Sequence, residues 1–258
     1  MNWLLVGIVF LIGSAVGSFV NVLVSRSVEG KNWATGRSHC DACGKTLRWY
    51  DLFPLFSYIT YRGKSRCCGK KLSLAHPLVE GLFGALFVWW LVVGFVFFRL
   101  ATTPGIVLQP LFWLGTGVLL LILAVADALY GVILMPILWV AAAWIYGYRL
   151  ALAMTGVYRW EDLGLTIMAG LLSFLFLWLL RVITKGRGMG DGDPYLAFVT
   201  GSLLSGMAAF WGMLLSFILG SIWGIGLLIL GNKKLGQTLP FGPFLVIAAF
   251  VTLLFIRF

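Results

Sequence analysis

Long apolar runs alternate with short polar segments along the whole chain, and this pattern predicts a bundle of membrane-spanning helices. A helix needs roughly 20 apolar residues to cross a bilayer. We expect eight spans, at residues 3–24, 77–98, 106–126, 132–150, 163–182, 194–210, 211–231 and 240–256. The alternating polarity of a membrane β-barrel is absent. The first run lacks the basic start and small-residue cleavage site of a signal peptide, so it is expected to be a span.

Composition agrees with an all-α polytopic membrane protein, since 61% of the 258 residues are hydrophobic and 11% are charged. The net charge of +10 does not indicate a nucleic-acid partner, because the positions of Lys and Arg set orientation in a membrane protein. With the N-terminus outside, fifteen of the 19 basic residues lie in or beside the loops 25–76, 127–131, 183–193 and 232–239. These loops are therefore expected in the cytoplasm. No internal repeat is evident.

A polar insert between the first two spans holds all four cysteines. Cys40 and Cys43 form a Cys-x-x-Cys pair, and Cys67 and Cys68 follow as neighbours. Two such pairs are typical of a zinc ribbon, whose metal supplies the folding energy that a short insert lacks. Because neighbouring cysteines point in different directions, Cys40, Cys43 and Cys68 are the stronger ligands. The fourth ligand is then Cys67, His39, His76 or water, and metal-free thiols are the alternative.

Two carboxylate sites fall at the same membrane face in this topology. Asp127 ends the third span, and Asp191 and Asp193 follow the fifth in a glycine-rich loop. An ionised side chain beside hydrocarbon is costly, so such a carboxylate is a functional-site hypothesis by default. Two acids on separate helices suit an aspartyl protease, in which one deprotonates a water while the other polarises the scissile carbonyl, without a metal. The structural alternative is a helix cap and a solvated loop.

Two other classes of function fit the same features. The carboxylates of a helical bundle also carry protons or cations in transporters, although a position at the cytoplasmic mouth rather than at mid-membrane disfavours this. The cysteine insert could instead make the chain a metal-binding scaffold of a secretion machine. Three polar groups near the cytoplasmic mouth are further candidates for binding, namely Asn21, Arg26 and Glu80. Gly13 and Gly17 form a small-residue face that favours close helix packing.

A set of short motifs, taken together, resembles the type IV prepilin peptidases, which combine a leader peptidase with an N-methyltransferase. The motifs are Gly17-Ser18-Phe19-Val20-Asn21-Val22 with Arg26, Arg37-Ser38-His39-Cys40-Asp41-Ala42-Cys43-Gly44, Trp49-Tyr50-Asp51-Leu52-Phe53-Pro54, Arg62-Gly63 with Arg66, Pro77-Leu78-Val79-Glu80, the Asp after the third span, and a Gly-x-Gly-Asp loop. The resemblance covers nearly the whole chain.

The loop can be read as Gly-x-Gly-Asp in two registers, ending at Asp191 or at Asp193. The family places a Leu three residues and a Gly eight residues after its catalytic Asp, and Leu196 and Gly201 fit the second register. The resemblance therefore implies catalysis by Asp127 and Asp193, with Asp191 as second choice.

The chain departs from the family pattern at three places. Ser65 stands where the family has a cysteine, with Cys67 and Cys68 adjacent after it. Ile133-Leu134-Met135 replaces the Ile-Pro-Asp or Ile-Pro-Asn that follows the first catalytic Asp, and Tyr195 replaces a Lys. None of these changes removes an aspartate.

The resemblance implies a function and a location. The chain would remove the basic leader of prepilins and pseudopilins after a Gly, at the cytoplasmic face of the bacterial inner membrane. It would then methylate the new N-terminus with S-adenosylmethionine, for which Asn21, Arg26 and Glu80 are weak candidate contacts. We expect three parts: a first helix at 1–24, a zinc-binding domain associated with methyl transfer at 25–76, and a peptidase core at 77–258. The pattern does not indicate an oligomeric state.

Overall fold

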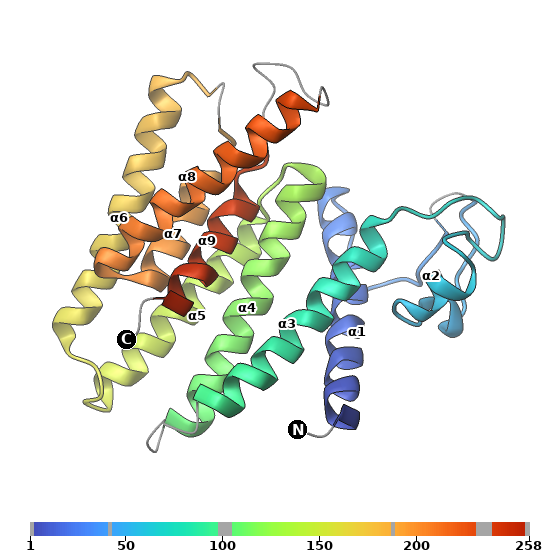
Figure 1. The fold of residues 1–258 in the computed structure, drawn as a ribbon, viewed down its shortest axis with the longest axis horizontal. Helices are drawn as coiled ribbons and strands as arrows, with labels where there is room; N and C mark the ends of the chain where they lie inside the picture. The colour runs from blue at the N-terminus through green and yellow to red at the C-terminus, as the bar shows by residue number, and fades with distance from the viewer. Residues whose placement is uncertain (1–2, 41–42, 98–104, 187–188, 231–238, 256–258) are drawn as a thin grey trace. The chain divides into compact units, whose positions relative to one another are not determined.

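The computed structural model describes residues 3–40, 43–97, 105–186, 189–230 and 239–255. Within these ranges the chain forms nine α-helices, one 3-10 helix and no β-strand, in agreement with the expected all-α class (Figure 1). Parts of three expected features lie outside the described residues: Asp41 and Ala42 of the first cysteine motif, Gly188 of the first loop register, and most of the loop 232–239.

Eight apolar helices occur where the pattern predicts spans. They are α1 (Trp3–Val28), α3 (Ala75–Phe97), α4 (Gly105–Tyr130), α5 (Met135–Met154), α6 (Trp160–Ile183), α7 (Asp193–Leu204), α8 (Gly206–Ile229) and α9 (Gly242–Phe255). Six of them are long and apolar enough to cross a membrane, so the chain is a multi-pass membrane protein. The other two, α7 and α9, have 12 and 14 residues and reach only about 18 and 21 Å.

The boundary between the expected sixth and seventh spans is several residues earlier than predicted. We expected it after residue 210, whereas the structure ends α7 at Leu204 and starts α8 at Gly206. Ser205 between them has φ 59° and ψ 158°, which an α-helix cannot accommodate. The apolar pattern continues through this point, so hydropathy alone gave no sign of the break.

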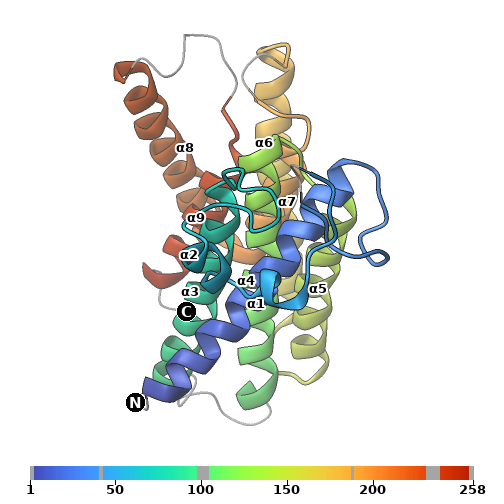
Figure 2. The ribbon, with the colours of Figure 1, turned by 90° about the vertical axis from the view of Figure 1, so that its right-hand side faces the viewer.

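The chain divides into two compact units, the first ending at Val118 and the second beginning at Leu119. In the first unit α1 packs along α3, as both views show (Figures 1 and 2). The expected small-residue face is confirmed. A Cβ on Gly13 would lie 2.5 Å from the Phe83 carbonyl oxygen, and one on Gly17 would lie 2.8 Å from the Glu80 Cα. Glycine at these positions lets the two backbones approach closely.

In the second unit α7 lies among α5, α6, α8 and α9, and ten of its 12 residues are buried. Its contact with α6 depends on small residues, since a Cβ on Gly201 would lie 2.3 Å from the Ser173 hydroxyl. The far end of α7 is held by the buried Arg149 of α5, whose Nη2 donates to the Leu203 carbonyl over 2.7 Å. The C-terminal end of α7 is therefore fixed by α5 and α6.

Candidate functional site

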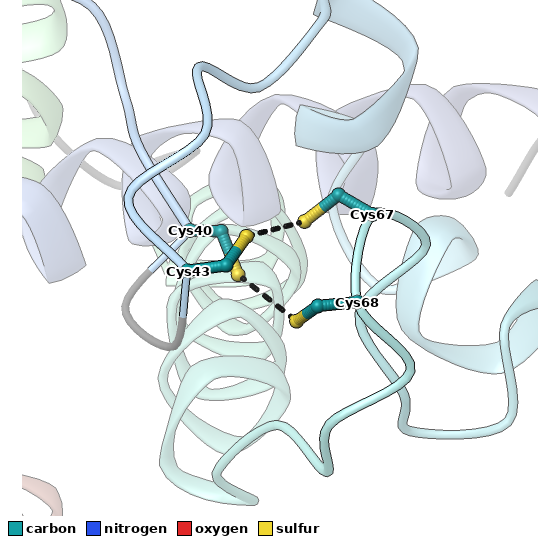
Figure 3. A group of neighbouring side chains, drawn as sticks. All are labelled: Cys40, Cys43, Cys67 and Cys68. Carbon is teal, nitrogen blue, oxygen red and sulfur yellow. Dashed lines mark hydrogen bonds between the residues drawn. The ribbon is translucent and has the colours of Figure 1, made fainter.

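The four cysteines form one group in the first unit (Figure 3). Their Sγ atoms all lie within 4.8 Å of one another, with 3.8 Å between Cys40 and Cys68 and 3.2 Å between Cys43 and Cys67. The expected fourth ligand was left open, and of the residues considered it is Cys67 that joins the group. The two thiols of the adjacent pair converge, contrary to the expectation that neighbours point apart.

Two turns of the same construction carry these cysteines. In the first, the Cys40 N–H donates to the Lys45 carbonyl and the Gly44 N–H donates to the Cys40 carbonyl. In the second, Ser65, Lys70 and Gly69 make the equivalent bonds. The turns are flanked by equivalent bridges, His39 with Thr46 and Lys64 with Lys71. The insert therefore contains an internal repeat with an offset of 25 residues, which we did not detect in the sequence.

The repeat explains how adjacent cysteines serve one site. Cys68 matches Cys43, each preceding the glycine of its turn, and Ser65 takes the backbone place of Cys40. Cys67 supplies the missing thiol. The Ser65 hydroxyl lies 3.2 Å from Cys40 Sγ and 3.1 Å from Cys67 Sγ. The site thus has four thiols, because the second turn carries its first cysteine two residues later than the first turn does.

A cavity of about 180 Å³ lies beside this group, lined by α1, the start of α3 and the insert. Two of the three polar candidates line it. Asn21 donates from Nδ2 to the His76 carbonyl over 3.3 Å, and the buried Glu80 accepts from the Leu55 N–H over 2.8 Å. Arg26 is not in the lining, because it donates to the carbonyls of Thr35 and Arg37 in the insert.

Glu80 has no cationic partner in the part of the chain that the structure describes. Its one hydrogen bond comes from a neutral backbone amide. That amide belongs to Leu55, which precedes the short helix α2 (Phe56–Thr60) and has φ 57°. The carboxylate therefore both fixes an unusual turn and presents negative charge to the cavity.

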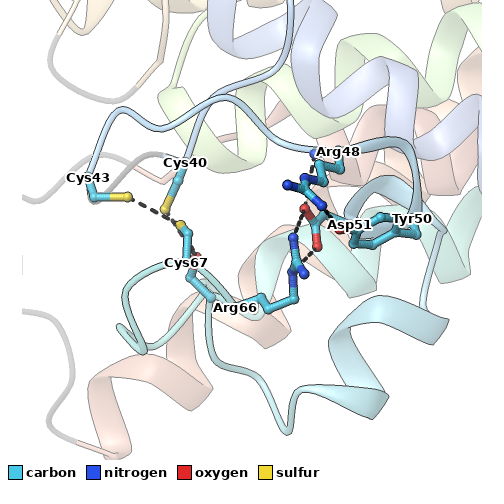
Figure 4. Close-up of polar contacts among 8 residues, drawn as sticks. Cys40, Cys43, Arg48, Tyr50, Asp51, Arg66 and Cys67 are labelled. Carbon is cyan, nitrogen blue, oxygen red and sulfur yellow. Dashed lines mark hydrogen bonds and ion pairs between the residues drawn. The ribbon is translucent and has the colours of Figure 1, made fainter.

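The second carboxylate of the cavity wall, Asp51, is neutralised (Figure 4). It lies in a 3-10 helix (Trp49–Leu52). Arg66 pairs with it, its Nε lying 2.8 Å from Oδ1 and its Nη2 donating to Oδ2 over 3.3 Å. The Arg66 guanidinium also lies 4.6 Å from the centre of the Tyr50 ring. Since Arg66 precedes Cys67, this ion pair connects the cysteine group to the cavity.

The second unit holds two buried carboxylates. Asp127 lies in the last turn of α4 and is 5% exposed, and its Oδ2 accepts from the Gly242 N–H at the start of α9 over 2.7 Å. Asp193 begins α7 and is 2% exposed, and its Oδ2 accepts from the Gly190 N–H over 2.9 Å. Each carboxylate is held through one oxygen by the backbone of a glycine.

The charges of the two aspartates interact. Asp193 lies outside the membrane-spanning helices, because it begins α7, which is too short to span a membrane. The pKa of Asp193 is raised to about 7, mainly by burial and secondly by the negative charge of Asp127. The hydrogen bond from the Gly190 N–H lowers this pKa and offsets part of the rise. A carboxyl group near another negative charge holds its proton more tightly. Asp191 is placed differently, because its 87% exposed side chain pairs with Arg181.

The segment after α4 and the glycine loop fit against each other. A Cβ on Gly192 would lie 2.7 Å from the Ile133 Cβ, so the glycine admits the isoleucine beside Asp193. Tyr195, which departs from the expected family pattern, packs edge-on against Trp139 of α5 and Phe174 of α6. These aromatic contacts accommodate a tyrosine near the start of α7.

Comparison with known proteins shows the family of this chain. Residues 11–94 match the family model described as the bacterial peptidase A24 N-terminal domain. A prepilin leader peptidase/N-methyltransferase of Aeromonas salmonicida is 30% identical over 290 aligned residues, covering 98% of this chain and 92% of the relative. The chain belongs to the prepilin leader peptidase/N-methyltransferase family. Relatives of the same name from Klebsiella pneumoniae and Pseudomonas aeruginosa are 34% and 29% identical, with 77% and 95% of this chain aligned to 85% and 88% of theirs. No solved structure matches.

One residue beside the aspartates of this prepilin leader peptidase/N-methyltransferase family member was not predicted from its sequence. Gly242 contacts Asp127 across 115 positions of sequence. The only available signal was the Pro-Phe-Gly-Pro stretch at 240–243, which we interpreted merely as the start of a span. A glycine between prolines at a helix start is a sign of close backbone approach.

Proposed function

We propose that this chain is a membrane aspartyl endopeptidase that removes the leader of prepilins and pseudopilins, and that it then methylates the new N-terminus. The observation that carries the peptidase assignment is the pair Asp127 and Asp193, two buried carboxylates from separate helices whose charges interact. The relatives are named for both activities.

Hydrolysis by this pair needs one proton shared between two acids. The ionised aspartate takes a proton from water, whose oxygen bonds to the scissile carbonyl carbon, while the protonated aspartate donates to the carbonyl oxygen. The resulting gem-diol collapses when the first aspartate returns its proton to the amide nitrogen. The C–N bond breaks, and the second aspartate regains its proton from the diol. No net proton is consumed within the pair.

We place Asp127, Asp193 and the cysteine insert on the cytoplasmic side of the bacterial inner membrane. The excess of Lys and Arg in the corresponding loops supports this orientation. A prepilin whose apolar N-terminal helix is already in the bilayer would present its basic leader there, and cleavage after a Gly would occur at the inner interface.

The direct test is cleavage of a co-expressed prepilin by variants of the aspartates. Asp127→Asn and Asp193→Asn should each abolish leader removal, measured as the intact mass of the pilin. Asp191→Asn is the matched control and should cleave normally, because Asp191 is exposed and paired with Arg181. Retained cleavage in both buried-site variants would refute the peptidase mechanism.

We assign methyl transfer to the cavity of the first unit. S-adenosylmethionine would supply an electrophilic methyl group: the new α-amine, after losing a proton to water, would bond to the methyl carbon while the sulfonium C–S bond breaks and S-adenosylhomocysteine leaves. Glu80, which has no cationic partner among the described residues, suits a positively charged group, and Asn21 lies on the same wall. Arg26 would act indirectly by holding residues 35–37. Glu80→Gln should weaken methyl-donor binding measured by calorimetry and leave leader removal intact; unchanged binding would refute this assignment.

We propose that the cysteine group holds a structural zinc ion. Tetrahedral Zn–S bonds of about 2.3 Å place sulfurs about 3.8 Å apart, and the Cys40–Cys68 distance is 3.8 Å. The Ser65 hydroxyl would donate to the thiolates rather than bind the metal. No metal is expected at the aspartate pair.

Zinc content by elemental analysis tests Cys67 as a ligand. Cys67→Ser should lose zinc, whereas Ser65→Ala should retain it. The double variant Ser65→Cys with Cys67→Ser restores the thiol at its place in the repeat and should recover one zinc per chain. Zinc retention in Cys67→Ser alone would exclude Cys67.

A further inference from the structure

Asp127 lies where its own helix disfavours a negative charge. It is in the last turn of α4, at the end that carries the partial negative charge of the helix dipole. Burial adds to this, since the residue is 5% exposed. A group outside α4 must compensate if Asp127 is to be the ionised member of the pair.

Gly242 provides that compensation. Its N–H donates to Asp127 Oδ2 over 2.7 Å at the start of α9, the end of a helix where backbone amides and the dipole favour an anion. The side chain of Asp127 makes no other hydrogen bond within the described residues, which leaves Oδ1 for water. A Cβ on Gly242 would lie 2.7 Å from Oδ2 and 3.1 Å from Cγ, so this approach requires glycine.

We propose that Gly242 is a positioning residue for peptide hydrolysis, whose N–H keeps Asp127 ionised as the general base and leaves the shared proton on Asp193. The inference rests on the proposed peptidase function. Asp127 and Asp193 then have separate roles, which cannot be assigned from their positions in the sequence. The raised pKa of Asp193 is consistent with the proton residing there.

Few other groups can disturb this arrangement. α9 and α8 carry no ionisable side chain, α7 carries only Asp193 and Tyr195, and α4 adds only Tyr130. Among the titratable groups of these four helices, Asp193 is the one whose pKa responds to the charge of Asp127. A pH profile of cleavage should report these two acids, its acidic limb following the acid that ionises first.

The experiment is the pH dependence of kcat/KM for leader removal by Gly242→Ala. The added methyl group should displace the Asp127 carboxylate from the Gly242 N–H. The midpoint of the acidic limb should then move up by about one pH unit, and kcat should fall with little change in KM. Gly226→Ala is the matched control, since a Cβ there meets nothing within 4 Å, and it should leave the limb in place. A change in folding alone would lower the amount of active enzyme without moving the limb.

The outcomes separate the two proposals. The role of Gly242 would be overturned if active Gly242→Ala kept its acidic limb at the same pH, or if the alkaline limb moved instead. The peptidase function would still stand. Absence of cleavage by the unmodified chain, or full cleavage by Asp127→Asn, would overturn the peptidase function itself. If Gly242→Ala does not fold, Pro243→Ala decides, because it adds no bulk but loosens the start of α9; a rise of the acidic limb supports the proposal and an unchanged limb refutes it.

Discussion

The contact between α1 and α3 predicts a large and selective effect of Gly17→Ala. The added Cβ would lie 2.8 Å from the Glu80 Cα and 3.0 Å from the Val79 carbonyl oxygen. Both are backbone atoms, so no side chain can swing aside. Ordinary carbon contacts begin at about 3.5 Å, and the two helices must therefore separate by about 0.7 Å.

This separation is costly and lies beside the proposed methyl-transfer cavity. Overpacking of this kind destabilises a protein by about 1–3 kcal/mol, which is roughly a 5- to 150-fold change in the folding equilibrium. Because the displaced segment of α3 carries Glu80, methyl transfer should fall. Leader removal should persist, because the two aspartates belong to the second unit.

Gly7→Ala on the same helix is the matched control, since a Cβ at Gly7 meets nothing within 4 Å. Both variants gain the same helix propensity, so their difference isolates the contact. The assay is thermal unfolding of the purified protein in detergent, together with intact-mass measurement of cleaved and methylated pilin. Equal stability and equal methylation in the two variants would refute the argument from packing.

Three further predictions concern the second unit. Asp127→Asn should lower the pKa of Asp193 from about 7 towards its ordinary value without reaching it, because burial is the larger cause; carboxyl infrared titration measures this. Since a raised pKa in the folded state costs stability as pH rises from about 4 to about 7, this variant should also lose less stability across that window in pH-dependent unfolding. Arg181→Gln should reduce stability by less than about 1 kcal/mol, because its partner Asp191 is exposed, and a larger loss in unfolding experiments would contradict this. Gly201→Ala should destabilise α6 against α7 and reduce cleavage, whereas Gly147→Ala, which meets nothing within 4 Å, should do neither.

The apolar pattern predicted which segments are helical, because each helix is specified by its own local sequence. Close packing of α1 on another helix was also foreseeable, since Gly13 and Gly17 lie on one helical face, but α3 as the partner was not. The cysteines were expected to form one site on their spacing alone. These predictions required no knowledge of distant partners.

The missed features depend on contacts between distant residues or on backbone conformation. Hydropathy does not report the left-handed backbone at Ser205, which shortens α7. The repeat of the two turns is carried by hydrogen bonds, and only the Cys-Gly-Lys triplets at 43–45 and 68–70 reveal it in the sequence. Gly242 reaches Asp127 from the last helix, and no local pattern encodes that pairing.

The contacts at the two ends of α7 predict how the enzyme selects the scissile bond. The glycine loop at the start of α7 packs against Ile133, and the Leu203 carbonyl near its end accepts from the guanidinium of Arg149, so we expect the helix not to slide relative to its neighbours. We therefore expect the Asp193 carboxyl to keep one depth relative to the bilayer. We expect selection by length, in which lengthening a pilin's apolar segment by one turn shifts the cut to a different residue.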